Sequence, residues 1–165
     1  KKKQSPILIS LIISNNASAK GIIYAKKSKL KHYIISFKNK KIFEKNVLKK
    51  LFNNKIDLIC LAGFMKILSS DFIKKFKKPI LNIHPSLLPR YKGLNTHKKV
   101  IKNGDKYSGT TVHLVNAKLD SGKIILQKKI KIAKHENEKT LEKKILKAEH
   151  KLYPKAIQKF LNSNF

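Results

Sequence analysis

The sequence predicts an α/β fold in which a mostly parallel sheet is flanked by helices, with an antiparallel pair of strands in the C-terminal half. Short β-branched apolar runs alternate with amphipathic stretches up to His84, which is the pattern of repeated strand–helix units. One run, Ile56–Ala62, is uninterrupted, as expected of a parallel strand covered on both faces. After residue 104, two strand-like segments are joined by a connection too short for a crossover helix, so they are predicted to pair antiparallel.

The first half of the chain predicts strands and helices in alternation. Ile7–Ile13 is expected to be a buried strand because Pro6 and Ser14-Asn15-Asn16 bound a β-branched run. Lys41–Asn53 is expected to be a helix because its apolar residues recur at spacings of three and four. The remaining elements expected in this half are helices at Ala17–Ser28 and Ser69–Phe76 and strands at Tyr33–Phe37, Ile56–Ala62 and Pro79–Ile83.

The second half predicts an antiparallel pair and a long helix. The two strands are Ser108–Val115 and Ile124–Ile132, and Asp120-Ser121-Gly122 is expected to form a turn between them. Asn137–Leu152 has the apolar spacing of an amphipathic helix. Pro154 is expected to kink or break this helix, because proline lacks the backbone N–H that a helix interior needs.

Length and composition indicate one domain with its own core. The chain has 165 residues and 41% hydrophobic content, but no apolar run approaches the ~20 residues of a transmembrane helix. No cleavage site follows Ile7–Ile13, so no signal peptide is expected. The single Cys60 excludes an internal disulfide and a multi-cysteine zinc site, and its apolar neighbours predict a buried, unreactive thiol. We therefore expect a cytoplasmic protein without a membrane or metal partner.

The net charge of +30 has two interpretations. A basic surface favours a polyanionic partner such as nucleic acid. However, Arg90 is the one arginine among 39 basic residues, and arginine supplies the planar fork with which nucleic-acid-binding proteins grip phosphates and bases. Lysines spread over nearly every segment are typical of a bias toward A/T-rich codons. We expect no nucleic-acid partner, and a basic nucleic-acid-binding protein remains the alternative from a different class.

Asn82 and His84 lie two residues apart at the end of a predicted strand, so their side chains point to the same face. Pro85 keeps His84 extended. A carboxamide and an imidazole placed in this way can stabilise an oxyanion and move protons, but they can also be ordinary hydrogen-bonded residues at a strand end. Asp120 can orient the imidazole as a third member of the site, or it can be a turn former.

Five blocks stand in order along the chain with compatible spacings: Leu61–Leu68, Leu81–Pro89, Tyr91–His97, Gly109–His113 and Leu119–Gln127. Together they resemble the motifs of the phosphoribosylglycinamide formyltransferase family, also called GAR transformylase. Glu149-His150, followed by Tyr153-Pro154, resembles the late helix of that family. The resemblance runs from about Ile7 to about Phe160.

The resemblance implies a Rossmann-like formyltransferase fold. It also implies transfer of the formyl group of the co-substrate 10-formyltetrahydrofolate to the amine of glycinamide ribonucleotide, in purine (IMP) biosynthesis and without a metal. The catalytic residues of the family are matched by Asn82, His84 and Asp120. Asn82 and protonated His84 would stabilise a tetrahedral oxyanion, while Asp120, with water, would support His84 and move protons. The ribonucleotide-binding positions are matched by Gly93 and Glu149. The folate-binding positions are matched by Met65, Lys66, Ile67, Leu68, Ile73 and Ile80.

The chain also departs from the family pattern. Lys66 stands where arginine is common, and Lys92 and Asn95 replace a usual proline and histidine. Ile7–Ile13 aligns with the second strand of the family, not the first. We therefore expect residues 1–165 to be a single formyltransferase domain that lacks about the first 25 residues of the family domain, including the loop that holds the substrate phosphate. On this expectation the activity of the 165-residue chain is uncertain.

Relatives of the same fold provide the alternative functions. A formyltetrahydrofolate deformylase would pass the formyl group to water, and a methionyl-tRNA formyltransferase would give the basic charge a purpose. The deformylase carries an extra N-terminal domain and the tRNA enzyme a second domain, neither of which is visible in the 165 residues. We expect a monomer or a homodimer that acts on small-molecule substrates.

Overall fold

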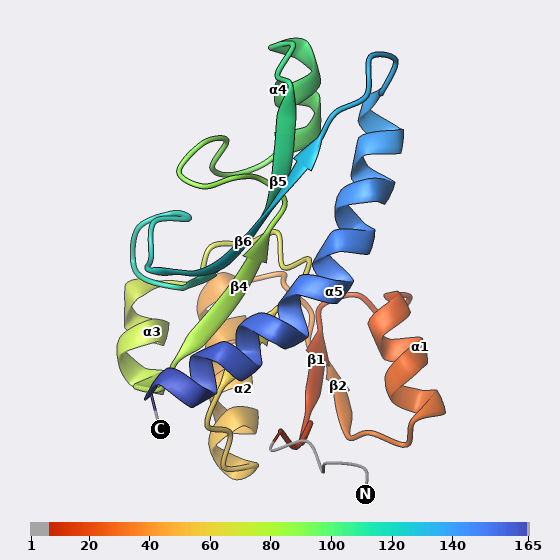
Figure 1. Cartoon of the computed structure of the whole chain (residues 1–165). Coiled ribbons are helices and arrows are strands. Elements are labelled where there is room, and N and C mark those ends of the chain that lie inside the picture. The colour runs from red at the N-terminus through yellow and green to blue at the C-terminus, as the bar shows by residue number, and fades with distance from the viewer. Residues whose placement is uncertain (1–6, 165) are drawn as a thin grey trace, which may run out of the picture. The chain divides into compact units, whose positions relative to one another are not determined.

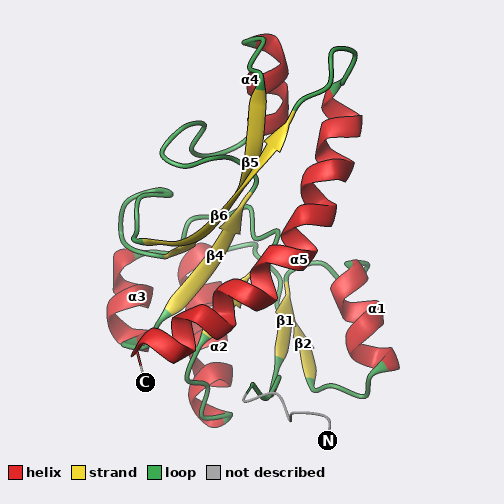
Figure 2. Ribbon diagram, in the orientation of Figure 1, coloured by secondary structure: helices red, strands yellow, loops and turns green. Residues whose placement is uncertain are grey.

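A computed structural model describes residues 7–164, in which helices and strands alternate along the chain (Figure 1; Figure 2). The order of the elements is β1 (Ile12–Ser14), α1 (Lys20–Lys27), β2 (His32–Ile34), α2 (Lys40–Asn53), β3 (Ile59–Leu61), α3 (Ser70–Phe76), β4 (Ile80–His84), α4 (Thr96–Lys102), β5 (Tyr107–Leu114), β6 (Ile124–Lys131) and α5 (Glu138–Asn164). The strand predicted at Ile7–Ile13 begins only at Ile12 in the structure, and Pro6, which was expected to bound it, lies outside the described residues.

The chain divides into two compact units, and the first extends to Asp57 and includes Lys74–Phe76. In this unit β1 and β2 pair in parallel, with Ile12 opposite His32, and α1 packs on both strands. The side chain of Asn39 caps α2 by accepting a hydrogen bond from the backbone N–H of Ile42, which satisfies one of the free donors at the start of the helix.

The second unit comprises residues 58–73 and 77–165 and contains a four-stranded sheet in the order β3-β4-β5-β6. β3 and β4 are parallel, whereas β4–β5 and β5–β6 are antiparallel. The helix α5 crosses one face of this sheet and contacts β5 and β6, and α4 packs against α5 (Figure 1). This arrangement leaves the carboxyl end of β4 and the connections that follow β4 and β5 free to build a site.

The core of the second unit forms where α5 covers the sheet. One cluster joins Ile83 of β4 and Val112 of β5 to Leu152 and Ala156 of α5. A second cluster joins Val100 of α4 to α5 residues on the preceding turns of the long helix, namely Leu141 and Ile145. The phenol of Tyr153, also on α5, donates to the backbone carbonyl groups of β3 and β4 at Leu61 and Leu81, 2.9 and 3.1 Å away.

The predicted α/β class, with parallel strands, flanking helices and an antiparallel pair in the C-terminal half, is confirmed. The predicted pairing of β5 with β6 is observed, and β4 with β5 adds a second antiparallel pair that the sequence did not predict. The helices predicted at Lys41–Asn53 and Ser69–Phe76 are each within one residue of α2 and α3.

Two predictions about the chain need correction, and one helix was not predicted. Of the two effects expected of Pro154, a break is excluded: α5 continues to Asn164, and buried residues on both sides of the proline, Leu152 and Ala156, hold the two halves on the sheet. Cys60 is exposed, not buried, since β3 is an edge strand of the sheet among the described residues. The helix α4 was not predicted at all.

The extended strands predicted at the start of the chain are shorter than expected. β1, β2 and β3 contain three residues each, and none of their residues is fully buried. The uninterrupted apolar run Ile56–Ala62 therefore forms a short strand that is only partly covered, in contrast to β4, of which four residues are buried. No helix within residues 7–164 has the length and apolarity needed to cross a membrane.

Candidate functional site

The carboxyl end of β4 carries Asn82 and His84, and neighbouring strands place further groups beside them. In the parallel pairing Leu61 is opposite Asn82, so the loop after β3 begins next to this amide. In the antiparallel pairing Asn82 is opposite His113 and His84 is opposite Thr111. His84 is only 6% exposed and is therefore held on a rigid strand with little access to bulk water.

Asp120 reaches this strand end from the connection between β5 and β6. Its carboxylate accepts a hydrogen bond of 2.8 Å from the backbone N–H of Gly93 and lies 3.4 Å from Nδ1 of His84, both through Oδ2. The other oxygen, Oδ1, is 3.6 Å from Nε2 of His113. Asp120 adopts a positive φ of 43°, a conformation that aspartate tolerates better than most residues, so the turn aims the side chain back at the sheet.

The two nitrogens of His84 both face acceptors. Nε2 lies 2.9 Å from the carbonyl oxygen of Tyr91, which can only accept, so Nε2 carries a proton. Nδ1 faces the carboxylate of Asp120, which also accepts when it is ionised. The imidazolium form of His84 satisfies both neighbours, whereas a neutral ring would turn a lone pair toward Asp120. The structure therefore places an acceptor beside each ring nitrogen of His84.

His113 has the opposite arrangement. Its Nδ1 donates to the carbonyl oxygen of Leu114 at 2.8 Å, and its Nε2 is 3.3 Å from the amide nitrogen of Asn82, which donates. Burial lowers the pKa of His113, which keeps the ring neutral, with Nε2 as an acceptor. His113 therefore fixes the orientation of the Asn82 amide and leaves its second N–H free. The sequence analysis assigned no role to this residue.

The predicted ribonucleotide-binding residues, Glu149 and Gly93, are connected to His84 through different residues: Glu149 through Thr110 and Gly93 through Asp120. Glu149 of α5 is 3.4 Å from the hydroxyl of Thr110, which also donates to the carbonyl oxygen of His84 at 3.1 Å. Burial raises the pKa of Glu149 to about 7, since few polar groups compensate a charge there. Gly93 has a φ of +75°, which suits glycine, and donates to Asp120.

The predicted folate-binding residues divide by exposure. Met65, Lys66 and Ile67, in the loop after β3, are exposed, so apolar side chains and backbone groups are available next to the strand end. Leu68 and Ile80 are buried and can contribute to a ligand pocket only from behind this surface, while Ile73 on α3 is partly buried. The contacts of the structure bring together Asn82, His84 and Asp120, but do not join them directly to these six residues.

A small cavity of about 130 Å³ lies against the carboxylate of Asp120. It is lined by Leu88, Pro89, Lys92, Asp120, Ser121, Gly122 and Ile124. This volume can hold several water molecules, since each takes up about 30 Å³ in liquid water. Water next to Asp120 is what proton movement between this carboxylate and a bound substrate requires.

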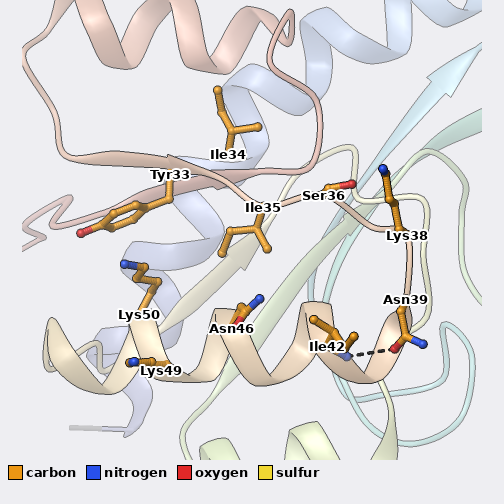
Figure 3. Close-up of a pocket in the computed structure, with 10 residues that line it drawn as sticks. All are labelled: Tyr33, Ile34, Ile35, Ser36, Lys38, Asn39, Ile42, Asn46, Lys49 and Lys50. Atoms are coloured by element: carbon orange, nitrogen blue, oxygen red, sulfur yellow. Dashed lines mark hydrogen bonds between the residues drawn. The ribbon is translucent and has the colours of Figure 1, made fainter.

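A larger cavity of about 600 Å³ lies in the first unit, between α2 and the chain around β2 (Figure 3). At one end Lys50 lies over the ring of Tyr33, 4.1 Å from its centroid. Lys38 and Lys49 also line the cavity. Lysine is abundant in most segments of this chain, so three lysines do not indicate an anion site. None of the predicted site residues lines this cavity.

Comparison with known proteins shows that this chain is similar to formyltransferases and to proteins of purine biosynthesis. The formyl transferase family model matches residues 1–157. Phosphoribosylglycinamide formyltransferase of Haemophilus influenzae is 40% identical over 158 residues, which cover 94% of this chain and 74% of that protein. The trifunctional purine biosynthetic protein adenosine-3 of Bos taurus is 39% identical over 153 residues, or 91% of this chain, but the match spans only 15% of that longer protein.

The solved structures that this chain resembles are also phosphoribosylglycinamide formyltransferases. The phosphoribosylglycinamide formyltransferase of Anaplasma phagocytophilum superposes with a TM-score of 0.88 at 38% identity, over 94% of this chain and 74% of that one. The enzyme of Bacillus halodurans gives a TM-score of 0.89 at 31% identity, over 94% of this chain and 82% of that one. The Rossmann-like formyltransferase fold expected from the sequence is confirmed by these neighbours.

Proposed function

Because the chain belongs to the formyl transferase family, and within it to the phosphoribosylglycinamide formyltransferases, we propose that it is a transferase of one-carbon groups. It transfers the formyl group of 10-formyltetrahydrofolate to the primary amine of glycinamide ribonucleotide, a step of de novo purine biosynthesis. The observation that carries the proposal is the meeting of Asn82, His84 and Asp120 at one strand end, with an imidazole whose two nitrogens both face acceptors.

The proposed reaction begins when the amine attacks the formyl carbon. A carbon–nitrogen bond forms and the formyl oxygen becomes an oxyanion. The free N–H of Asn82 and the imidazolium of His84 stabilise this charge, and preorganised donors of this kind typically contribute about 10²–10³ in rate each. The bond to the folate nitrogen then breaks, and that nitrogen gains a proton while the amine loses one.

We propose that Asp120, with water, transfers these protons. Its carboxylate is close enough to His84 to stabilise the imidazolium, at 3.4 Å, and the cavity beside it offers room for water. Glu149, with a pKa of about 7, and the backbone of Gly93 are proposed to contact the ribonucleotide. For the folate we propose the loop at Met65–Leu68, with Ile73 and Ile80 behind it, because exposed apolar side chains next to backbone groups suit a planar ring.

We also propose the domain boundaries and partners implied by the resemblance. Residues 1–165 belong to one formyltransferase domain. In support, the family model matches residues 1–157. The substrates are small molecules, no nucleic acid or membrane takes part, the location is cytoplasmic, and the protein is a monomer or a homodimer.

The proposed roles are tested by single substitutions. His84→Ala removes the imidazolium and Asn82→Ala removes one oxyanion donor, so we expect each to lower kcat for formyl transfer by at least about 10². The matched control is His135→Ala, because His135 is exposed in the loop before α5. Circular dichroism spectra would show whether the fold is intact. A folded His84→Ala variant with wild-type turnover would contradict the mechanism.

A further inference from the structure

The backbone of Tyr91 approaches the proposed catalytic histidine in an unusual conformation. Tyr91 has a φ of +54°, in the left-handed region that a bulky residue adopts only under strain. In this conformation its carbonyl oxygen accepts from Nε2 of His84 at 2.9 Å and from the hydroxyl of Ser86 at 3.2 Å. Such a conformation persists only where the surroundings hold it, so the groups that hold Tyr91 also determine what His84 faces.

The side chain of Tyr91 is held by three residues. Its hydroxyl donates to Oδ2 of Asp105 at 2.6 Å and accepts from the Asn103 side chain at 2.9 Å. Nη2 of Arg90 lies 3.0 Å from each oxygen of Asp105 and 3.1 Å from the Tyr91 hydroxyl. We refer to Arg90, Tyr91, Asn103 and Asp105 as the Tyr91 clamp. It connects the chain after β4 with the chain after α4.

Within the Tyr91 clamp, Asp105 is the central acceptor. It receives both the phenol and the guanidinium, and its side chain is 15% exposed, against 61% for Arg90. An ion pair to an exposed arginine contributes little by itself, because water screens it. A short hydrogen bond from a phenol to a carboxylate is charge-assisted and stronger. The contact that holds the ring of Tyr91 is therefore the one to Asp105.

We propose that Asp105 is a positioning residue for His84, acting through Tyr91. By holding the phenol, it keeps the Tyr91 carbonyl on Nε2 of His84, which fixes the proton on that nitrogen and turns Nδ1 toward Asp120. The role rests on the proposed function, since it assumes that His84 acts in formyl transfer. Without the Tyr91 clamp, Tyr91 is free to leave the left-handed region, and His84 loses the acceptor that determines its protonation.

The test compares variants of the full 165-residue chain. Asp105→Ala removes the acceptor and Tyr91→Phe removes one oxygen atom while keeping the backbone carbonyl. The matched control is Glu136→Ala, which breaks an ion pair of similar length and burial: Glu136 lies 2.9 Å from Lys144, its side chain is 7% exposed, and it contacts neither His84 nor Tyr91. If Asp105→Ala does not fold, Tyr91→Phe carries the test.

The first readout is the ¹⁵N chemical shifts of the two His84 ring nitrogens, assigned with a His84→Gln variant. In the wild type we expect both nitrogens to give the shifts of a protonated imidazolium. In Tyr91→Phe and Asp105→Ala we expect the signals to move toward the shifts of a neutral ring at the same pH, while Glu136→Ala leaves them unchanged. Wild-type shifts in a folded Asp105→Ala variant, or equal changes in the control, would overturn the proposal.

The second readout is kinetic and separates the inference from the proposed function. We expect Tyr91→Phe and Asp105→Ala to lower kcat about 10- to 10²-fold while KM for the formyl folate changes less than about threefold, because misplacement of a catalytic group affects the transition state. Shifted ¹⁵N signals with an unchanged kcat would refute the positioning role. A wild-type chain without formyl transfer would refute the proposed function, and the ¹⁵N signals would still decide whether Asp105 sets the protonation of His84.

Discussion

The ring of His84 lies between two hydrogen-bond acceptors that come from two different loops. The carbonyl oxygen of Tyr91 lies on one side of the ring and the carboxylate of Asp120 on the other. The neighbouring His113 donates to its own strand and accepts from Asn82, so it stays neutral. Two histidines on adjacent strands thus have different partners: His84 faces an acceptor at each ring nitrogen, whereas His113 faces one acceptor and one donor and so orients the amide of Asn82.

The buried carboxyl group of Glu149 makes the stability of the protein depend on pH. Its pKa is raised to about 7 in the folded protein, compared with 4.5 in the unfolded chain, so the folded state holds this proton more tightly. Stability from the neutral carboxyl is fully present below pH 4.5 and is lost as the pH rises through 7, by up to about 3 kcal/mol. We therefore expect Glu149→Gln to stabilise the protein at pH 8 and to have little effect at pH 4.5.

Urea denaturation of the wild type and Glu149→Gln at pH 4.5, 6 and 8 would measure this difference. Glu142→Gln is the control, since Glu142 lies on the same helix and is exposed. A stability difference between wild type and Glu149→Gln that does not change with pH would mean that burial of this carboxyl is not the cause.

At the residue scale, the sequence predicted the proposed catalytic residues better than the residues that hold them in position. The spacing of Asn82 and His84 and the turn at Asp120 left a purely structural interpretation open, and it was the family resemblance that singled out these three residues, which the structure brings together. His113 could not be assigned, because its contact with Asn82 depends on the antiparallel register of β4 and β5, which no local pattern encodes. The Tyr91 clamp was missed for the same reason: Asp105 is 14 residues from Tyr91 along the chain.

At the element scale, long periodic segments were predictable and short ones were not. α2 and the central turns of α5 have repeated apolar positions. α4 is seven residues long and buries only Thr96 and Val100, so no apolar periodicity marks it. The side chain of Asn95, its N-cap residue, makes no capping hydrogen bond. The continuation of α5 through Pro154 was missed because tertiary packing compensates a local cost of about 3 kcal/mol.

The connection between β5 and β6 makes a prediction at this scale. A Cβ atom at Gly122 would overlap the backbone carbonyl group of Leu114, and the adjacent Lys123 accepts from the Leu114 N–H at 2.9 Å. We expect Gly122→Ala to lower the free energy of unfolding by about 2–3 kcal/mol and to displace Asp120, two residues away, with loss of formyl transfer.

Gly21→Ala is the control for this prediction, because nothing lies within 4 Å of a Cβ there and the residue is on α1. We expect this substitution to stabilise the protein by about 0.5–1 kcal/mol, since alanine is a better helix former. Chemical denaturation would measure both variants. If Gly122→Ala were as stable as the wild type, the close approach of this turn to β5 would be in doubt.

At the scale of the whole molecule, the chain carries a net charge of +30 on 165 residues. Like charges at this density repel one another and destabilise the compact state, and salt screens the repulsion. We therefore expect Tm to rise by about 2–5 °C between about 10 mM and 300 mM sodium chloride. Differential scanning calorimetry would measure the shift, and a Tm that falls with salt would mean that favourable ion pairs outweigh the repulsion.

The central claim is formyl transfer to a specific acceptor, and one assay tests it most directly. The protein would be supplied with 10-formyltetrahydrofolate with and without glycinamide ribonucleotide. We predict loss of the formyl group only when the ribonucleotide is present. Formyl loss that does not depend on the ribonucleotide would indicate a deformylase, and an absence of folate chemistry would contradict the account.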